Sequence, residues 1–479
     1  MKIVRLLAVL VLACGPLAAA DEGPRLSDRL AAGPRGRYAV WVYFKDKGEA
    51  AEALASARRT VTARALARRA LRGGNGAVTV ADAPPLAAYV SAVSAAATRL
   101  RQQSRWLNAV SVEATAGQVR AIESLPFVDR VDVVRGFRKR GDEIDLRATT
   151  LEAAEPLRKA STLDYGTSFG QVNQIKVPFL HDVGLDGRGV MVAVLDAGFN
   201  NLSHEAFAAT RIVAMRDFVN GDESVADGGI GEGSHGTATL SVIGGFKDGQ
   251  IIGPAYAASF ILAKTENTES ETPVEEDNWA AAVEWAEALG VDVISSSLGY
   301  LVYDPPFPSY TAADMDGETA ISTRAADLAG ERGVVVVNSA GNEGLDTRTN
   351  TLGAPADGDL VLAVGAVTST GARASFSSVG PSADGRIKPD VAAQGVAVKV
   401  ARPNSRTGYT TADGTSFSCP LTAGVAALLL QANPSATVPQ VLNALRSTAS
   451  QAGRPDNLLG YGIVDALAAL RVLAPQRLP

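Results

Sequence analysis

The chain has 479 residues, which is too long for one ordinary domain and indicates two or three units. Hydrophobic residues make up 46% of it and charged residues 20%, which excludes a disordered chain and allows a core without disulfides or metals. The net charge of -6 is unevenly spread: the first 20 residues carry +2 and residues 21–140 carry +10, which leaves -18 for residues 141–479.

The first 20 residues are typical of an export signal. Lys2 and Arg5 precede a short apolar stretch at 6–13, and three alanines at 18–20 supply a small-residue cleavage site. The apolar stretch is too short to span a membrane, and no later stretch has the composition of a span. We therefore expect a secreted or periplasmic protein. Segment 11–15 also fits, less well, a lipoprotein cleavage box with Cys14 as the lipid attachment point, and only lipidation there would tie the protein to a membrane.

Residues 21–140 predict a small α+β domain. Alternation and helical spacing predict strands at 37–44, 106–114 and 128–134 and helices at 49–72, 86–103 and 117–125. The polar residues 141–165 are typical of a linker that is cleaved. Because this unit is basic and the remainder is acidic, we expect the two to dock by electrostatic attraction. Nucleic acid is not expected as a partner of an exported protein.

From about residue 170 the pattern changes to short apolar runs separated by helical segments. Strands are predicted at 190–195, 258–264, 291–297, 333–340 and 359–367, with helices at 276–289 and 319–332. Continuous apolar strands that alternate with helices indicate a parallel sheet covered on both faces.

Polar residues that could perform catalysis follow three of these segments. Asp196 ends the first strand, where an open parallel sheet forms its sites, although a turn-forming Asp is common there. His235 is one of only three histidines and stands among small residues at a helix start, whereas His204 and His181 lie in less suitable contexts. A general base with a pKa near neutrality is most simply a histidine.

The strongest signal surrounds Ser416. It begins an apolar helix, whose unpaired N–H groups and dipole favour a developing negative charge, although an ordinary N-cap serine has the same position. Pro420 is expected in the first turn of that helix. Asn342 follows the strand at 333–340 in a Gly-flanked loop and could direct its amide at an oxyanion, or serve only as a turn residue.

The Asp-Ala-Gly, His-Gly-Thr, Ala-Gly-Asn and Gly-Thr-Ser-Phe-Ser-Cys-Pro motifs around these residues, in this order, resemble the subtilisin-like serine protease family. Segments 295–299 and 376–395 agree, and the resemblance covers about 185–475. More weakly, residues 37–135 resemble the family's propeptide, an intramolecular chaperone and inhibitor. The resemblance implies an α/β, subtilisin-like three-layer fold with a mostly parallel sheet, preceded by a small α+β propeptide domain.

Carried over by position, the resemblance implies an Asp196, His235 and Ser416 triad that hydrolyses peptide bonds in polypeptide substrates through an acyl-enzyme. Asn342 and the Ser416 backbone N–H would hold the oxyanion. The substrate backbone would pair with Ser297, Leu298 and Gly299, and small Ala340 and Gly341 would leave room beside the P1 side chain. The expected enzyme needs no cofactor and acts as a monomer.

Three departures from the family pattern bear on tuning and specificity, not on the reaction. Ala197 replaces the Ser or Thr usual after the aspartate, and Tyr300 stands where a small residue is common and could narrow the pocket. Residues 301–318 form a longer loop near the cleft.

Segments 217–229 and 314–318 supply oxygen ligands of the kind that Ca²⁺ takes, but fit equally well as solvated acidic loops.

We therefore expect a signal at 1–20, an inhibitory propeptide at 21–160 and a peptidase domain at 161–479, with self-cleavage between Arg140 and Gln171. The alternatives are a narrowly specific processing protease and a catalytically silent binding module. The intact set of catalytic residue types speaks against the silent module. A G-x-S-x-G elbow does not surround Ser416, which disfavours another esterase fold.

Overall fold

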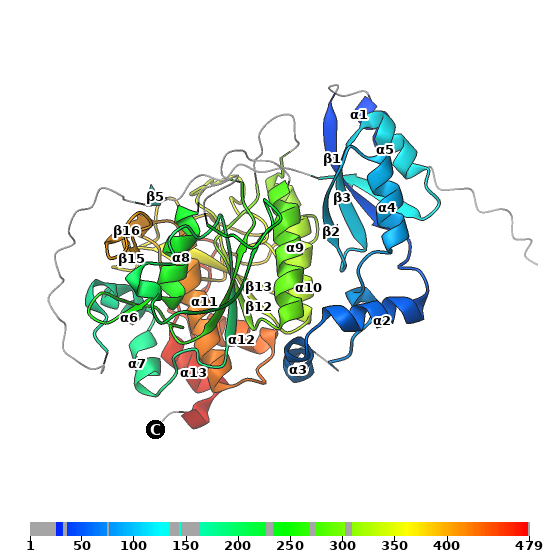
Figure 1. Ribbon diagram of the computed structural model, residues 1–479. Coiled ribbons are helices and arrows are strands. Elements are labelled where there is room, and N and C mark those ends of the chain that lie inside the picture. The colour runs from blue at the N-terminus through cyan, green and yellow to red at the C-terminus, as the bar shows by residue number, and fades with distance from the viewer. Residues whose placement is uncertain are drawn as a thin grey trace, which may run out of the picture.

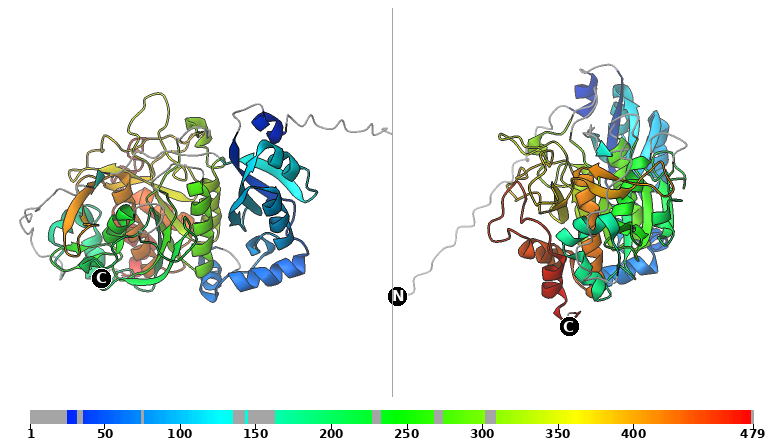
Figure 2. Two further views of the ribbon diagram at one scale, coloured as in Figure 1. Left: turned by 45° about the horizontal axis from the view of Figure 1, so that its top comes forward. Right: turned by 90° about the vertical axis from the view of Figure 1, so that its left-hand side faces the viewer.

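The computed structural model describes residues 25–31, 36–73, 76–134, 143–144, 163–226, 233–267, 274–301 and 309–477. The predicted signal, Cys14 and most of the predicted linker lie outside these ranges. The described residues form a small N-terminal unit beside a larger C-terminal unit, and helices α9 and α10 lie between the two (Figures 1 and 2).

The N-terminal unit is an antiparallel sheet with helices on one face. Its elements are α1 (Leu26–Ala31), β1 (Arg37–Phe44), α2 (Ala50–Thr60), α3 (Ala63–Arg72), α4 (Ala87–Ala96), β2 (Arg99–Ser104), β3 (Ala109–Thr115), α5 (Ala116–Glu123) and β4 (Val128–Val133). The strand order is β2-β3-β1-β4, with β3 and β4 on either side of β1. Alternate residues such as Val40 and Val42 pack under α4 and α5. The predicted α+β domain is thus confirmed.

Two helix predictions in this unit were wrong in extent. The helix expected at 49–72 is broken, because Val61 is extended and Thr62 starts α3 as an N-cap that accepts a hydrogen bond from the Ala65 N–H. The helix expected at 86–103 ends at Ala96, and β2 follows it. Residues 99–104 carry no strand pattern of their own; they become a strand because they pair with β3.

The C-terminal unit is built on a seven-stranded sheet whose neighbouring strands are all parallel. In sheet order the strands are β14 (Val391–Gln394), β13 (Val361–Val367), β12 (Val335–Ser339), β11 (Val293–Ser296), β6 (Met191–Asp196), β10 (Ser259–Lys264) and β7 (Arg211–Asp217). Smaller strands are β5 (Glu143–Ile144), β8 (Phe246–Lys247), β9 (Ile251–Ile252), β15 (Val398–Ala401) and β16 (Tyr409–Asp413). The predicted parallel sheet is confirmed.

Helices cover both faces of this sheet. The unit contains α6 (Phe169–Gln174), α7 (Val177–Asp182), α8 (Ser234–Gly244), α9 (Val274–Leu289), α10 (Ile321–Glu331), α11 (Thr415–Ala432), α12 (Val438–Thr448) and α13 (Ala466–Leu473). Along β6, Val192 and Val194 pack on the side of α8 and α11, whereas Ala193 and Leu195 pack on the side of α9 and α10. This alternation makes the three layers.

Helix α11 is the central helix of the unit. Contrary to the expectation that no stretch after the signal has the composition of a membrane span, α11 has the length and hydropathy of one, alone among the described helices, and 94% of that stretch is buried inside the protein. Its apolar character therefore reflects its position in the core. The helix runs from the carboxyl edge of the sheet, so its first residues lie where β6 and β12 also end.

Candidate active site

Asp196 and His235 are joined by a short hydrogen bond. Asp196 ends β6 and is fully buried, and its Oδ1 lies 2.7 Å from Nδ1 of His235, whose side chain is 16% exposed. Gly236 lets α8 approach β6 this closely, since a Cβ there would meet the Gly198 carbonyl oxygen at 2.2 Å. A carboxylate that accepts from Nδ1 leaves Nε2 as the nitrogen that can take a proton.

The aspartate carboxylate has two further donors. The backbone N–H of Ala197 donates to Oδ1 at 2.7 Å, and the hydroxyl of Thr239 donates to Oδ2 at 2.9 Å. Thr239 was not among the predicted site residues. Its only signal in the sequence is its position four residues after His235, which places both on one face of α8.

Ser416 is the second residue of α11, so Pro420 lies beyond the first turn in which it was expected. A proline at this position cannot donate to the carbonyl oxygen of Ser416, four residues earlier. The hydroxyl of Ser297 donates to that oxygen instead, at 2.7 Å, and Ser416 Oγ donates to the carbonyl oxygen of Ser297 at 3.1 Å. Ser297, which was predicted to bind substrate, therefore also fixes Ser416.

Asn342 has a fixed amide orientation. Its Oδ1 accepts from the backbone N–H and the hydroxyl of Thr415, at 2.9 and 2.8 Å. The Nδ2 end of the amide therefore points away from Thr415, the residue before Ser416 to which the Oδ1 end is hydrogen-bonded. Thr415 was not among the predicted site residues, and its position next to the motif serine is its only signal.

A small pocket lies beside Asn342. Its lining residues are Gly299, Leu301, Ser339, Gly341, Asn342, Glu343, Thr351 and Gly353. The structure thus brings Gly299 and Gly341 together at this pocket. Leu298 and Ala340 are buried behind it and make backbone contacts, the former to Asn338 Nδ2 and the latter to Gly353.

Tyr300 does not narrow this pocket. Its side chain is fully buried, and its hydroxyl donates to Glu266 Oε1 at 2.8 Å. Burial and the carboxylate of Glu266 hold the pKa of Tyr300 well above its ordinary value. Its backbone pairs with that of Ala354, next to Gly353 in the pocket lining. The expectation that Tyr300 shapes specificity is replaced by a role in the core.

The two other histidines and the buried cysteine have structural surroundings. His181 contacts the Tyr165 hydroxyl at 2.6 Å through Nδ1, and His204 contacts the Gly408 carbonyl at 2.7 Å through Nε2. Burial raises the pKa of Cys419 to about 12, and its sulfur lies 3.4 Å from the Ser296 and Val337 carbonyls. A thiol of such high pKa is a poor nucleophile.

The acidic residues that suggested calcium are engaged locally where the structure describes them. Asp217 accepts from two backbone N–H groups of its own loop and lies 3.3 Å from Lys264, and Asp316 caps the turn at Glu318 and Thr319. Within the described ranges, three or more His, Cys, Asp or Glu side chains do not gather in a metal-binding group.

Comparison with known proteins identifies the class. The model of the subtilase family of S8 peptidases matches residues 187–462, and the model of the S8 propeptide domain of Bacteroidota matches residues 39–146. The chain therefore belongs to the subtilase family and is a subtilisin-type serine endopeptidase with a propeptide domain.

Individual relatives agree with this assignment. Subtilisin NAT from Bacillus subtilis subsp. natto is 33% identical over 311 residues, which are 65% of this chain and 72% of that protein. Subtilisin DY from Bacillus licheniformis is 34% identical over 310 residues, which are 65% of this chain and 99% of that protein. Fervidolysin from Fervidobacterium pennivorans, a keratinolytic enzyme, shares the fold with a TM-score of 0.62 at 22% identity; the match covers 92% of this chain and spans 61% of that one.

Proposed function

We propose that Asp196, His235 and Ser416 are the catalytic triad of this peptidase. Ser416 Oγ attacks the scissile carbonyl, and His235 takes its proton at Nε2 and then delivers it to the leaving amine. Asp196 holds the imidazole in the tautomer with Nδ1–H and stabilises the imidazolium. The observation that carries this proposal is the 2.7 Å contact between Asp196 and His235 at the edge of the sheet where α11 presents Ser416.

The oxyanion of the tetrahedral intermediate is held by Asn342 Nδ2 and the Ser416 backbone N–H. The backbone N–H and the hydroxyl of Thr415 fix the Asn342 amide so that its Nδ2 hydrogens face away from Thr415. Preorganised donors such as this amide supply much of the rate acceleration in acyl transfer. The P1 side chain enters the pocket lined by Gly299 and Gly341. The segment from Ser297 to Gly299 pairs with the substrate backbone as an added strand.

A serine-directed fluorophosphonate tests the nucleophile directly. We expect one adduct per molecule of processed enzyme, with the mass shift in the peptide that contains Ser416 and loss of peptide hydrolysis. Ser418 is the matched control, because it lies on the same helix and its hydroxyl donates to the Thr415 carbonyl at 2.9 Å. Labelling that persists in Ser416→Ala but not in Ser418→Ala would overturn the assignment.

The chain is made as an exported precursor with a signal at 1–20, a propeptide at 21–160 and the peptidase at 161–479. The propeptide acts as intramolecular chaperone and inhibitor, and the enzyme cuts itself between Arg140 and Gln171. Two observations support this order of events. The N-terminal unit packs against α9 through the basic residues described below, and β5 pairs antiparallel with β16, which ends three residues before Ser416.

The substrates are polypeptides, and the mature enzyme is a secreted or periplasmic monomer, anchored to a membrane only if Cys14 is lipidated. A general degrading protease and a narrowly specific processing protease differ in their tolerance at P1. A peptide panel varied at P1 separates the two, because a processing enzyme rejects most members.

A further inference from the structure

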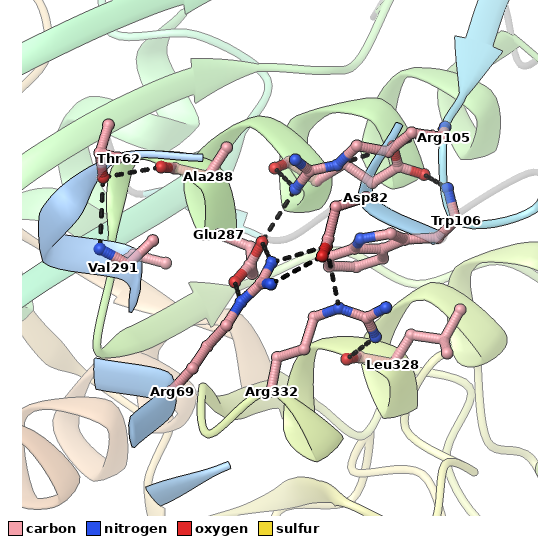
Figure 3. A network of polar contacts seen from close by, with 12 residues as sticks. Thr62, Arg69, Asp82, Arg105, Trp106, Glu287, Ala288, Val291, Leu328 and Arg332 are labelled. Atoms are coloured by element: carbon pink, nitrogen blue, oxygen red, sulfur yellow. Dashed lines mark hydrogen bonds and ion pairs between the residues drawn. The ribbon is translucent and has the colours of Figure 1, made fainter. Parts of the chain in front are cut away.

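Four carboxylates of the peptidase form a row on the surface that faces the propeptide. Asp277, Glu284 and Glu287 share one face of α9, and Asp292 follows it, each at most 7% exposed in its side chain. Each is paired with at least one arginine of the N-terminal unit. Figure 3 shows Glu287 at the centre of this network, with Arg69 and Arg105 directed toward it.

The arginines come mainly from α3. Arg69 pairs with Glu287 through two contacts of 2.8 Å, Arg72 pairs with Asp292 at 2.9 Å, and Arg68 also binds Glu287. In β2 and the turn after it, Arg101 lies 3.1 Å from Asp277 and Arg105 lies 2.8 Å from Glu287. Burial alone would raise the pKa of Glu287, but the hydrogen bonds of Arg69 and the charge of Arg68 hold it below its ordinary value.

The surface is also shaped for a helix. A Cβ at Gly290 would meet the backbone nitrogen of Ala65 at 2.7 Å, and a Cβ at Gly333 would meet the Cβ of Arg72 at 2.8 Å. The backbone of α3 therefore lies in two notches beside the carboxylates. Trp285 and Phe218 line the cavity of about 450 Å³ next to them, at the boundary between the two units. Glu287, Asp292 and the two notches together define a binding site for a helix that carries arginines, and Asp277 and Glu284 extend its acidic surface.

We propose that this face remains on the mature peptidase as a docking site for arginine-rich helical segments of polypeptide substrates, separate from the active site. When the propeptide leaves, Asp277, Glu284, Glu287 and Asp292 lose these guanidinium partners, and an acidic row beside the two glycine notches is left. Guanidinium groups are weakly hydrated and pair with carboxylates in bidentate geometry, so a new arginine-bearing helix is the ligand that best replaces α3. This inference rests on the proposed function, because it concerns the substrates of the same enzyme.

The test uses the processed wild-type enzyme and two substrates with one cleavable sequence. One carries the helix sequence of residues 63–72 through a Gly-Ser linker of about 30 residues, whose r.m.s. span is about 30 Å. The other carries the same tag with every arginine replaced by glutamine. We expect a KM about 10-fold lower for the arginine tag at equal kcat, and loss of the difference at about 0.5 M salt. Equal KM values for the two tags would overturn the proposal.

Variants and competition complete the test. Glu287→Gln should abolish the preference for the arginine tag, whereas Glu331→Gln, an exposed acid at the end of α10, should retain it. If Glu287→Gln fails to mature, the free tag peptide replaces it: it should raise the KM of the tagged substrate and leave a short untagged peptide unaffected. Equal inhibition of both substrates would mean that the tag binds the active site, which also overturns the proposal. A wild type that cannot cut the short peptide would instead refute the proposed function.

A second inference concerns Thr239 and rests on separate contacts. We infer that Thr239 is a positioning residue that supplies the side-chain hydroxyl to Asp196 which Ala197 lacks. Thr239 and Asp196 are both fully buried, and the hydroxyl lies 2.9 Å from Oδ2, against 3.2 Å from the Gly236 carbonyl. Both oxygens only accept, and the shorter contact and the charge of the carboxylate direct the single hydroxyl proton at Asp196. With His235 at the other oxygen, α8 then fixes both ends of the carboxylate.

Substitutions that keep the shape separate this role from packing. Thr239→Val should lower kcat about 10-fold with KM unchanged, Thr239→Ser should keep most of the activity, and Ala197→Ser should restore part of the loss in the Thr239→Val background. Thr237→Val is the control on the same helix, since its hydroxyl contacts Asn200 and Gly233. An unchanged kcat in Thr239→Val, or an equal loss in Thr239→Ser, would overturn the inference. Activity that survives Ser416→Ala would refute the triad itself.

Discussion

The hydroxyl of Ser297 donates to the carbonyl oxygen of Ser416 at 2.7 Å, and the hydroxyl of Ser416 donates to the carbonyl oxygen of Ser297 at 3.1 Å. This exchange connects the end of β11 to the start of α11. The Ser416 carbonyl is open to the Ser297 hydroxyl because Pro420 has no N–H to donate to it within the helix. The segment proposed to bind substrate and the proposed nucleophile are thus held by one pair of hydrogen bonds.

Removal of the Ser297 hydroxyl should therefore destabilise the peptidase. In the Ser416→Ala background, which avoids self-digestion, Ser297→Ala leaves a buried carbonyl without its donor, and we expect a loss of about 1–3 kcal/mol in the free energy of unfolding. Ser295→Ala is the matched control, because that hydroxyl lies 3.9 Å from the Cys419 sulfur and makes only a weak contact. Denaturant unfolding measures both. Equal losses in the two variants would contradict the role of Ser297.

Asn342 should affect the chemical step rather than binding. Asn342→Asp keeps an oxygen for the Thr415 N–H but removes the amide donor, so we expect kcat to fall about 100- to 1000-fold with little change in KM. Asn342→Ala should lose a similar factor. Steady-state kinetics on a short peptide measure both values. A normal kcat in Asn342→Asp would show that the amide does not serve the oxyanion.

Arg68 should determine how tightly the propeptide binds. Its guanidinium is 2% exposed and pairs with Glu287, so Arg68→Ala leaves that carboxylate buried with one partner fewer. Breaking a buried pair costs about 3–5 kcal/mol, which predicts a loss of at least about 100-fold in inhibition by the propeptide. Arg58→Ala, at an exposed position of α2, should change little. The inhibition constants of the wild-type, Arg68→Ala and Arg58→Ala propeptides are measured on the processed enzyme. Similar constants for wild type and Arg68→Ala would refute the ionic docking.

Glu276 should make stability depend on pH. Burial raises its pKa to about 7 despite hydrogen bonds from Ser322 and Tyr310. The folded chain therefore holds this proton up to a higher pH than the unfolded chain, and the stability it contributes at low pH is lost between about pH 4.5 and 7. The free energy of unfolding of the Ser416→Ala precursor should fall by up to about 3 kcal/mol between these pH values, relative to the same precursor with Glu276→Gln added. Parallel pH profiles of the two proteins would contradict the buried titration.

The sequence could predict the strands and the motif residues because both are local signals. The apolar runs that became β6, β11 and β12 needed no tertiary information, and Asp196, His235 and Ser416 stand out by residue type and motif. Residues 99–104 could not be placed, since their strand exists only through pairing with β3. Thr239 was missed and Tyr300 was misjudged for a related reason. Side-chain direction in the folded protein, toward Asp196 in one case and Glu266 in the other, decides their roles.

The charge asymmetry predicted that the two units dock, but not how. Four acidic residues of α9 look alike in the sequence. Three of them pair with arginines of the propeptide: Asp277, Glu284 and Glu287. The fourth, Glu276, instead accepts hydrogen bonds from Ser322 of α10. Helical phase relative to the sheet decides between them, and this phase is set by packing of α9 against Ala193 and Leu195. The partners of α3 therefore had to come from the structure.

The most direct test compares wild type with Ser416→Ala, each expressed with its own N-terminal segment and measured by intact mass. The account predicts that the wild type loses its N-terminal part by a cut between residues 140 and 171, while Ser416→Ala stays uncut at that position. Equal processing of both proteins would contradict self-cleavage by Ser416 and would assign the cut to another protease.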